Sequence, residues 1–398
     1  MNLPSQLTHI DLFAGCGGIS LGLHNAGWKG VFALEKSPMA FQTLKHNLID
    51  KGPHFDWPFW LPVSEHDIME VLQSYRNELH ALSGQVDLVV GGPPCQGFSF
   101  AGQRNEKDER NNLANSYVEF VSLVKPQAIL FENVRGFTVG FGKGSAFECE
   151  AYSKRVSRDL QALGYRTKDE IVDFSEFGIP QARKRYLLAG FLSKNPDRFF
   201  EILHETRSSF LEAKGLGIRV TLGEALSDLE RSNGEIPSDE CKAFKQGIYG
   251  SPVGPYQELM RKGGGRLPDS HRFANHRKKT IERLEYIQTN CPKGKQVEKS
   301  IRTKLGLKKN VIIPLDNADQ CPTLTTLPDD YIHYSEPRIL TVRECARIQS
   351  FPDWFEFKSS YTTGGFRRKN EAPRYTQVGN AVPPLFAELA GNVLGELM

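Results

Sequence analysis

A single cysteine stands where a strand-like segment breaks into a stiff loop. The segment 86–90 is short, apolar and β-rich, and Pro93 and Pro94 follow it closely, so Cys95 is expected just past the carboxyl end of a central strand. Open α/β sheets bind their ligands at that edge. A thiolate there could act as a nucleophile in covalent catalysis. The alternative is an inert buried thiol, because free cysteine is often a small core residue.

Three charged residues could act with this thiol. Glu132 ends the apolar run "AILFE", and an acid at a strand end is uncommon without a partner. Arg183 and Arg185 lie two apart in "IPQARKRY", which places them on one face of an extended segment. Such cations could bind a phosphate, position the Glu132 carboxylate or lower the pKa of the Cys95 thiol. The alternatives are a buried Glu132 that binds Arg135 or a backbone amide, and arginines that merely decorate an edge strand.

A glycine-rich turn indicates a nucleotide-like ligand. In "DLFAGCGGISLGL" a strand runs into Gly15, Gly17 and Gly18, and a helix is expected to follow, which offers free backbone N–H groups to a ligand. Glu35 ends the next strand, 20 residues after Gly15, where a carboxylate binds ribose hydroxyls. The dinucleotide fingerprint requires a glycine where Ser20 stands, so the pattern favours a nucleoside cofactor without a pyrophosphate over NAD.

A second acid, Asp67 in "EHDI", follows a third short strand-like segment. Its carboxylate could accept a hydrogen bond from an adenine amino group. The alternative is that Asp67 is the N-cap of the helix "IMEVLQSY".

The elements that must position these residues alternate between strand and helix over the first 190 or so residues. We expect strands at 9–13, 30–35, 86–90, 128–132 and 186–191, and helices at 37–49 and 116–124, the first with Ser37 as N-cap and Pro38 in its first turn. This alternation predicts an α/β fold with a parallel sheet and helices on both faces. Glycine clusters and many prolines over 203–337 predict a second, less regular domain. A segment with helical periodicity, 341–351, and an amphipathic C-terminal helix follow.

The bulk composition is that of an ordinary globular protein, with 39% hydrophobic and 24% charged residues. No apolar run approaches the roughly 18–20 residues that span a bilayer, and the N-terminal "MNLPSQLTHIDLF" lacks the features of a signal peptide. Seven scattered cysteines without a CxxC pair predict a reducing, cytoplasmic compartment, with neither a metal site nor a disulfide framework.

The net charge of +3 conceals a strong asymmetry. Residues 261–310 contain 15 Lys/Arg and 4 Asp/Glu, a balance of +11, which leaves 3 − 11 = −8 for the rest of the chain. A solvated charged face is the usual explanation of a short basic run. A surplus this large within 50 residues of an otherwise acidic chain favours a polyanionic partner such as nucleic acid.

Taken together and in this order, the blocks "DLFAGCGG", "GGPPCQGFS", "FENV", "IPQARKRY", "RILTVRECARIQSFP" and "YTQVGNAV" resemble those of the DNA (cytosine-5)-methyltransferase family. The resemblance extends over nearly the whole chain. It implies a Rossmann-like S-adenosylmethionine-dependent methyltransferase domain at 1–200, a smaller irregular target-recognition domain at 201–337, and a C-terminal segment, 338–398, that returns to the first domain. It also implies transfer of a methyl group from S-adenosylmethionine to carbon 5 of a flipped-out cytosine in duplex DNA.

The resemblance also assigns roles to single residues. Cys95 matches the catalytic nucleophile, with Glu132, Arg183 and Arg185 as the other catalytic residues. The positions implied around the cofactor are Phe13, Ala14, Gly15, Gly17, Gly18, Glu35, Asp67, Ile68, Pro94, Leu113, Asn380, Ala381 and Val382. Those implied at the DNA are Gln96, Ser99, Arg110 and Thr323, the last followed by Leu324. The chain departs from the family at Lys36, where an aromatic residue often stands, so Phe13 is expected to provide more of the adenine stacking.

The resemblance implies double-stranded DNA as the partner, a monomer, and a bacterial cytoplasmic location at the nucleoid, with a possible cognate restriction endonuclease in the same system. The alternative activity is an RNA (tRNA) cytosine C5 methyltransferase, although those relatives usually carry "PCQPFT" where this chain has "PCQGFS". A further alternative is a catalytically inactive DNA-binding regulator. It would be expected to lack the nucleophile or its acid, yet Cys95 and Glu132 are both present.

Overall fold

The computed structural model describes residues 6–94, 113–139, 151–364, 367 and 371–398. Packing divides the chain into two compact units. Unit 1 comprises Met1–Asp173, Lys184–Arg207 and Phe386–Met398, and unit 2 comprises Phe174–Arg183 and Ser208–Leu385. These units are defined by packing, whereas the domains expected at 1–200, 201–337 and 338–398 are defined by function, and that functional division stays a prediction.

Unit 1 is built on a six-stranded sheet with the strand order β2-β1-β3-β4-β7-β5. Its strands are β1 (Thr8–Leu12), β2 (Lys29–Leu34), β3 (Leu88–Gly91), β4 (Ala128–Val134), β5 (Arg166–Asp173) and β7 (Lys184–Phe191). The first four run parallel to one another, and β7 runs antiparallel to both of its neighbours. The central β3 is buried at all four residues, as expected for a strand that helices cover on both faces.

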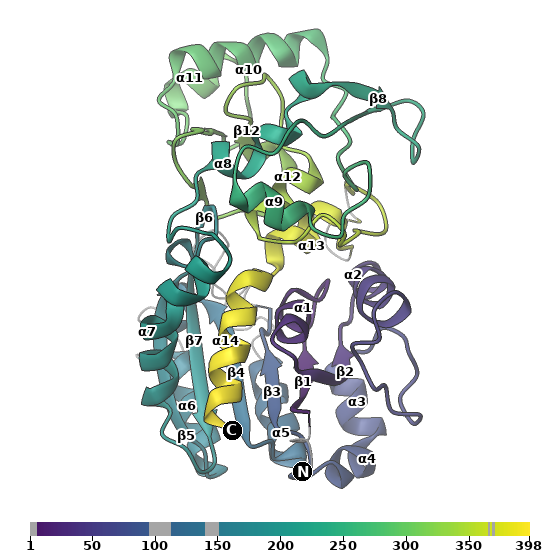
Figure 1. Ribbon diagram of the computed structural model, residues 1–398, viewed down its shortest axis with the longest axis vertical. Helices are drawn as coiled ribbons and strands as arrows, with labels where there is room; N and C mark the ends of the chain where they lie inside the picture. The colour runs from purple at the N-terminus through teal and green to yellow at the C-terminus, as the bar shows by residue number, and fades with distance from the viewer. Residues whose placement is uncertain (1–5, 95–112, 140–150, 365–366, 368–370) are drawn as a thin grey trace. The chain divides into compact units, whose positions relative to one another are not determined.

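Helices cover both faces of this sheet (Figure 1). On one face, α1 (Gly18–Asn25) packs near α14 (Pro384–Leu397), where the Trp28 indole Nε1 donates to the Gly391 carbonyl oxygen at 2.9 Å. On the other face lie α3 (Ile68–Ser74), α4 (Arg76–Ala81), α5 (Leu113–Val124) and α6 (Tyr152–Ala162). Their apolar side chains form one cluster with the sheet, in which Tyr117 and Phe120 are fully buried. Each such side chain contributes about 1.5–3 kcal/mol to folding.

The remaining helices of this unit connect the strands. They are α2 (Pro38–Lys45), the π-helix η1 (His46–Asp50) and the 3₁₀ helix η3 (Arg135–Thr138), while α7 (Asp197–Ala213) continues into unit 2. The Ser37 hydroxyl accepts from the Ala40 amide at the start of α2, which confirms the predicted N-cap. No helix in the described ranges is long and apolar enough to cross a bilayer.

The strands expected at 9–13, 30–35, 86–90, 128–132 and 186–191 and the helices expected at 37–49 and 116–124 are present with shifted ends, and three features differ from the expectation. The strand-like segment expected before Asp67 is not a strand but part of the loop that leads to α3. The strand expected at 186–191 is β7, which runs antiparallel instead of parallel, because the neighbouring β5 supplies a hairpin-like return that sequence periodicity did not indicate. The helix expected at 37–49 ends at Lys45 and continues as the π-helix η1.

Unit 2 is less regular, as predicted from its glycines and prolines. Its sheets have two strands each, β6–β11, β8–β9 and β10–β12. The strands are β6 (Gln181–Ala182), β8 (Glu235–Pro237), β9 (Lys245–Gly247), β10 (Ile313–Pro314), β11 (Cys321–Pro322) and β12 (Tyr331–Ile332). The helices are η4 (Phe174–Glu176), α8 (Leu222–Leu226), η5 (Ser227–Leu229), η6 (Arg231–Asn233), α9 (Pro255–Arg261), α10 (Lys278–Asn290), α11 (Lys299–Lys304), η7 (Pro328–Asp330), α12 (Val342–Ile348) and α13 (Arg374–Asn380).

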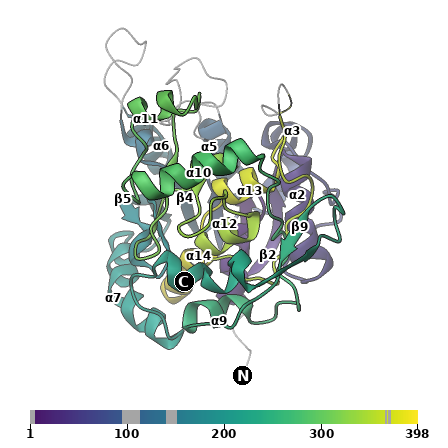
Figure 2. The same ribbon diagram turned by 90° about the horizontal axis from the view of Figure 1, so that it is seen from above.

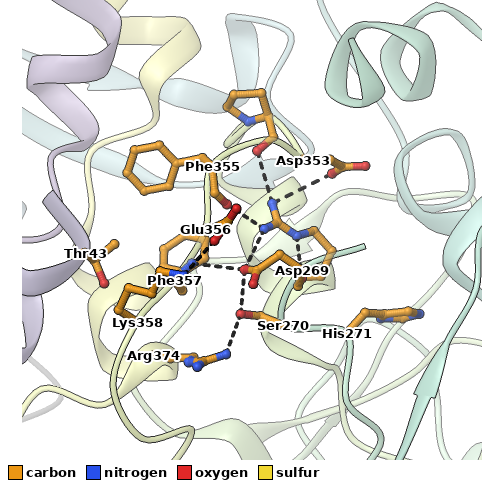
Figure 3. A network of polar contacts seen from close by, with 12 residues as sticks. Thr43, Asp269, Ser270, His271, Asp353, Phe355, Glu356, Phe357, Lys358 and Arg374 are labelled. Atoms are coloured by element: carbon orange, nitrogen blue, oxygen red, sulfur yellow. Dashed lines mark hydrogen bonds and ion pairs between the residues drawn. The ribbon is translucent and has the colours of Figure 1, made fainter. Parts of the chain in front are cut away.

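The block "TVRECARIQSF" forms the charged core of unit 2. All seven residues of α12 are buried, including Arg343 and Arg347. The Arg343 guanidinium donates to the Asp269 carboxylate at 3.1 Å and to the Phe355 carbonyl oxygen at 2.6 Å (Figure 3). Arg347 lies between Asp228 and Asp353, with contacts of 2.6 Å to each carboxylate. Removal of one partner from such a buried pair is strongly destabilising, because a charge is left without compensation.

The helices α10 and α11 share a small hydrophobic cluster with Ile312 and with Ile332 of β12. Leu284 and Ile287 of α10 are buried against Cys291 and Val297, and Ile301 of α11 packs on them. Both helices therefore pack on this one cluster, and they lie near each other in unit 2 (Figures 1 and 2). This packing leaves the polar faces of both helices to carry charged residues.

Candidate active site

The predicted site residues of unit 1 gather at one edge of its sheet. Since β1, β2, β3 and β4 are parallel, their carboxyl ends meet there. The antiparallel β7 brings its amino-terminal end to the same edge, with Arg185 opposite Val134 in the register. The turn after β1, the residues after β2 and β3 and the end of β4 therefore share this edge with Arg185.

The turn after β1 has the conformation that its glycines predicted. Gly17 has a φ of +93° and is the N-cap of α1, and a Cβ atom there would lie 2.9 Å from Leu48 Cδ1, so only glycine fits. The Gly15 amide donates to one Glu35 carboxylate oxygen at 2.9 Å, and the Ser37 amide donates to the other at 2.7 Å. Burial raises the pKa of Glu35, against the effect of these two hydrogen bonds. Glu35 is thus held at the turn, and its binding of ribose hydroxyls stays a prediction.

Two further features of this turn lie at its start. Phe13, an expected cofactor contact, has a φ of +60°, a strained conformation for a bulky residue and one that often marks a functional site. Next to it, the buried Asp11 carboxylate accepts from the Ser20 hydroxyl at 2.6 Å. Burial raises the pKa of Asp11 to about 7. Ser20 stands where a dinucleotide fingerprint has glycine, and in the structure its hydroxyl ties α1 to β1.

Asp67 is an N-cap, and it also pairs with a cation. Its Oδ1 accepts from the Met69 amide at 2.9 Å at the start of α3, which confirms the capping alternative. Its Oδ2 accepts from the Lys36 ammonium at 2.6 Å. Burial raises the pKa of Asp67, but the bonds from Lys36 and Met69 together hold it below its usual value. The next residue, Ile68, is buried in the core.

Glu132 and Arg185 form an ion pair at the same edge. The Arg185 Nε lies 3.0 Å from Glu132 Oε1, and the two side chains are only 12% and 16% exposed. The pair is possible because β7 runs antiparallel to β4 and places Arg185 diagonally across from Glu132. Arg135, the alternative partner, lies exposed in η3. The contact with Arg185 agrees with the expectation that a cation positions this carboxylate.

Glu132 lies beside the residues that lead to Cys95. A Cβ atom on Gly92 would lie 2.8 Å from Glu132 Oε2, so a larger residue at position 92 would have to displace the carboxylate. The side-chain amide of the buried Asn133 donates to the Pro93 carbonyl oxygen at 3.2 Å. Sequence reasoning missed Asn133, although a polar residue within the apolar "FENV" block could have indicated it.

Four predicted residues lie outside the described ranges, Cys95, Gln96, Ser99 and Arg110. The residues on either side are described. Pro94 is exposed, and Leu113 begins α5 and packs against the main hydrophobic cluster.

The two arginines of "QARKR" have separate environments, although they were expected to share one face. Arg183 belongs to unit 2, where it is buried and its guanidinium donates to the Gly379 carbonyl oxygen at 3.1 Å and to the Leu324 carbonyl oxygen at 3.4 Å. The local reason is that Arg183 follows the short strand β6, which pairs with β11 of unit 2, while β7 begins at Lys184 in unit 1. Its catalytic role stays a prediction.

Arg183 is part of a buried amide network that sequence reasoning missed. The Gln181 side chain donates to the Gln349 side-chain oxygen at 2.9 Å and accepts from the Leu324 amide at 2.9 Å. Gln349 in turn donates to the Val378 carbonyl oxygen at 2.9 Å. The network joins the blocks "IPQARKRY", "RIQSFP" and "YTQVGN", and the only signal in the sequence was that each block contains a glutamine.

The other predicted residues of unit 2 lie on segments that this network contacts. The exposed Thr323 donates its hydroxyl to the Ala182 carbonyl oxygen at 2.6 Å. Asn380 is exposed at the end of α13, and Ala381 and Val382 follow it partly buried. The Ala381 carbonyl oxygen accepts from Gln349 at 3.2 Å. No cluster of His, Cys, Asp and Glu able to hold a metal ion occurs among the residues that the structure describes.

Comparison with known proteins agrees with this geometry. The family model for C-5 cytosine-specific DNA methylase matches residues 7–396. The Type II methyltransferase M.DdeI of Desulfomicrobium norvegicum is 31% identical over 95% of this chain and 86% of its own length. M1.HphI of Haemophilus parahaemolyticus, also a Type II methyltransferase, is 29% identical over 96% and 85%.

Two solved structures share the fold. A DNA modification methyltransferase encoded within an E. coli prophage aligns with a TM-score of 0.64 and 24% identity over 98% of this chain and 99% of its own. The S. pombe Dnmt2 methyltransferase aligns with a TM-score of 0.55 and 16% identity over 99% and 98%. At these identities the likeness extends to the α/β methyltransferase fold.

Proposed function

The chain belongs to the C-5 cytosine-specific DNA methylase family, and we propose that Cys95, Glu132 and Arg185 form its catalytic centre. The family reaction transfers the methyl group of S-adenosylmethionine to carbon 5 of cytosine in DNA. The observation that carries the proposal is the Glu132–Arg185 ion pair of 3.0 Å, which lies beside Gly92, three residues before Cys95. The pair supplies a positioned acid and a cation at the edge where the thiol is expected.

The residues at this edge fit S-adenosylmethionine. Each Glu35 carboxylate oxygen accepts one backbone N–H and keeps lone pairs for the hydroxyls of a ribose. We assign cofactor contacts to Phe13, Ala14, Gly15, Gly17, Gly18, Glu35, Asp67, Ile68, Pro94 and Leu113 of unit 1 and to Asn380, Ala381 and Val382 of unit 2. When bound, the cofactor supplies an electrophilic methyl group on a sulfonium.

The protein's own residues activate the cytosine. Carbon 5 of cytosine is a poor nucleophile, and addition of the Cys95 thiolate to carbon 6 makes it enamine-like. Negative charge moves toward ring N3, where a proton from the Glu132 carboxyl neutralises it. The Arg185 guanidinium then stabilises the carboxylate that forms on Glu132. After carbon 5 is methylated, its proton is lost to a base and the Cys95 thiolate departs, which restores the 5,6 double bond. Ring N3 returns its proton to the Glu132 carboxylate in this step, so the product is neutral and the acid is restored.

Arg183 has a different role in this proposal. Its guanidinium is buried and bonds to backbone carbonyl oxygens of Leu324 and Gly379. We therefore treat Arg183 as a positioning residue that holds the segment around Thr323 and the end of α13. A direct part of Arg183 in the chemistry stays a prediction.

The α10–α11 helical pair supports duplex DNA as the substrate. Residues 277–309 contain 11 Lys/Arg and 3 Asp/Glu, and Lys278, Lys279, Lys299 and Lys304 are exposed. Such cations bind phosphates without reading sequence, while a few side chains read base edges. We assign DNA contacts to Gln96, Ser99, Arg110 and Thr323, and the target base is flipped out at a cost of about a few kcal/mol.

The experiment that tests this function is base-resolution bisulfite sequencing of DNA from cells that express the protein or its Cys95→Ser variant. We expect protected cytosines at one short motif with the wild type and none with the variant, which should still bind DNA. Full activity of Cys95→Ser would contradict the thiol mechanism. Methylation of tRNA but not of duplex DNA by the purified protein would support the RNA alternative.

The biological setting is also a proposal. Curated relatives are named Type II methyltransferases, which supports a restriction–modification system with a cognate endonuclease that is not a stable partner. We propose a monomer that acts in the bacterial cytoplasm at the nucleoid. Sedimentation of the purified protein as a dimer would contradict the proposed monomer. Its co-purification with an endonuclease would contradict the proposal that the endonuclease is not a stable partner.

A further inference from the structure

Lys36 is the residue that joins two loops of the proposed cofactor site. It directly follows Glu35, and its ammonium lies 2.6 Å from Asp67 Oδ2. The Lys36 side chain is 79% exposed, whereas that of Asp67 is only 16% exposed. An exposed cation is thus tied to an acid that is largely enclosed.

Two more hydrogen bonds hold these residues in place, one between the two loops and one within the second loop. The Glu35 carbonyl oxygen accepts from the His66 amide at 2.8 Å, which ties the end of β2 to the turn before α3. Asp67 Oδ1 accepts from the Met69 amide at 2.9 Å, so this oxygen is fixed by the start of the helix. Lys36 completes the arrangement, because without it Oδ2 would lose its one described donor. Each carboxylate oxygen still has a lone pair for a further donor.

We propose that Lys36 is a positioning residue for the cofactor, because its ammonium fixes the Asp67 carboxylate to accept the exocyclic amine of the adenine ring. The inference rests on the proposed placement of the cofactor at Glu35 and Asp67. It assigns Lys36 an electrostatic part in binding in place of stacking on the base.

The size and salt dependence of the effect follow from the exposure of the pair. Ion pairs of this kind contribute about 0.2–1 kcal/mol, which corresponds to a factor of up to about five in a dissociation constant. The attraction is screened as ionic strength rises, since one partner is exposed to water. Removal of the Lys36 ammonium is therefore expected to raise the dissociation constant of the cofactor only slightly at low salt and not at all at high salt.

The experiment measures binding of S-adenosylhomocysteine to the full-length protein by calorimetry, without any methyl transfer. We expect Lys36→Met to weaken binding by about three- to fivefold at low salt and by less than about 1.5-fold at 0.5 M salt. Asp67→Asn should weaken binding more, and Lys36→Met should have no further effect in the Asp67→Asn background. This non-additivity is expected if Lys36 acts through Asp67.

A second ligand identifies the group on the base. S-inosylhomocysteine carries a carbonyl where the adenine ring carries its amine, so Asp67 cannot accept a hydrogen bond there. We expect Lys36→Met to leave the affinity for this ligand unchanged. An equal loss for both ligands would overturn the role of Lys36 in recognition of the amine.

Lys45→Met is the matched control. Lys45 pairs with Asp50 at 2.7 Å after α2, an exposed ion pair of the same type that is not assigned to the cofactor. We expect this variant to bind S-adenosylhomocysteine as the wild type does, and thermal unfolding of each variant shows whether it is folded.

Two outcomes separate this inference from the proposed function. If Asp67→Asn weakens binding but Lys36→Met does not, or if Lys36→Met tightens it, the role of Lys36 is wrong while the cofactor site stands. If neither Glu35→Gln nor Asp67→Asn changes the affinity of a folded protein, the placement of the cofactor is wrong, and the inference falls with it.

Discussion

Arg185→Met removes the guanidinium from Glu132 and keeps a side chain of similar length. In the structure the two groups lie 3.0 Å apart, and both side chains are largely enclosed. The variant therefore leaves a carboxyl group beside Gly92 without the cation that stabilises its charged form. In the proposed reaction Glu132 passes a proton to the base, so the loss of Arg185 raises the free energy of the state in which the proton has moved.

The magnitude follows from the burial of this pair. Removal of one partner from a buried, hydrogen-bonded charge pair costs about 2–5 kcal/mol, and the residual exposure of 12% and 16% places this pair toward the lower half of that range. A cost of about 2–3.5 kcal/mol in the transition state corresponds to a decrease of about 30- to 400-fold in kcat. Arg185→Lys keeps the charge but loses the planar donor, so we expect a loss of about tenfold.

The assay is single-turnover methyl transfer to a duplex that contains the motif found by bisulfite sequencing. We expect kcat to fall while the dissociation constants of S-adenosylhomocysteine and DNA stay within about twofold, because the interaction matters mainly after the proton moves. Lys184→Met is the matched control on the same strand. Lys184 is exposed and lies 3.5 Å from Asp173, so its loss should leave kcat within about twofold.

Two results would refute this reasoning. The first is an Arg185→Met variant that retains kcat within about threefold of the wild type. The second is an equal loss in Lys184→Met, which would show that the strand end as a whole is disturbed. A double variant with Glu132→Gln should be no slower than Glu132→Gln alone, since the two side chains act as one unit.

Three further predictions concern stability and DNA binding. Burial lowers the pKa of His9 to about 3 and that of His54 to about 2, so below about pH 6.5 the unfolded chain takes up protons that the folded chain does not. The free energy of unfolding should therefore fall by about 1.4 kcal/mol per pH unit for each imidazole from pH 6.5 toward pH 3, and in His54→Leu, measured by urea unfolding at several pH values, it should fall less steeply with decreasing pH. Neutralisation of the basic run 277–279 should lower DNA affinity about equally for all sequences and reduce the salt slope of binding by about 1–3, and an unchanged slope in a salt titration would contradict this placement. Asp353→Asn removes one of the carboxylates that surround Arg347 and should destabilise the protein by about 3 kcal/mol in denaturant unfolding, while a loss below about 1 kcal/mol would show that the remaining contacts suffice.

Much of unit 1 could be predicted because its signals are local. The apolar runs at β1, β2, β3 and β4 are long enough to be recognised, and the glycines after β1 identify a turn that only they can adopt. Parallel strands place their carboxyl ends at one edge, so the approach of Glu35 and Glu132 to that edge could be expected from their places at strand ends. Asp67 follows no strand, and the bond from the His66 amide to the Glu35 carbonyl oxygen is what holds its loop beside β2.

The partners of these residues could not be predicted in the same way. Glu132 contacts Arg185 because β7 is antiparallel, and the direction of a strand depends on β5, which periodicity did not reveal. Asp67 proved to be both an N-cap and the partner of Lys36, because a short carboxylate can accept donors from two directions. Arg183 lies in unit 2 and Arg185 in unit 1, although only one residue separates them in the sequence.

The motif blocks of the sequence indicated the family, and through that resemblance the cofactor and the reaction, while the apolar runs indicated the strand edge at which the charged residues gather. They did so because motif residues, turns and apolar periodicity are properties of short segments. Only the tertiary structure decided which charges meet, since ion pairs and the Gln181–Gln349 contact join segments that are up to 168 residues apart along the chain. Such pairings depend on strand direction and on the packing of whole units, and short-range patterns carry no record of either.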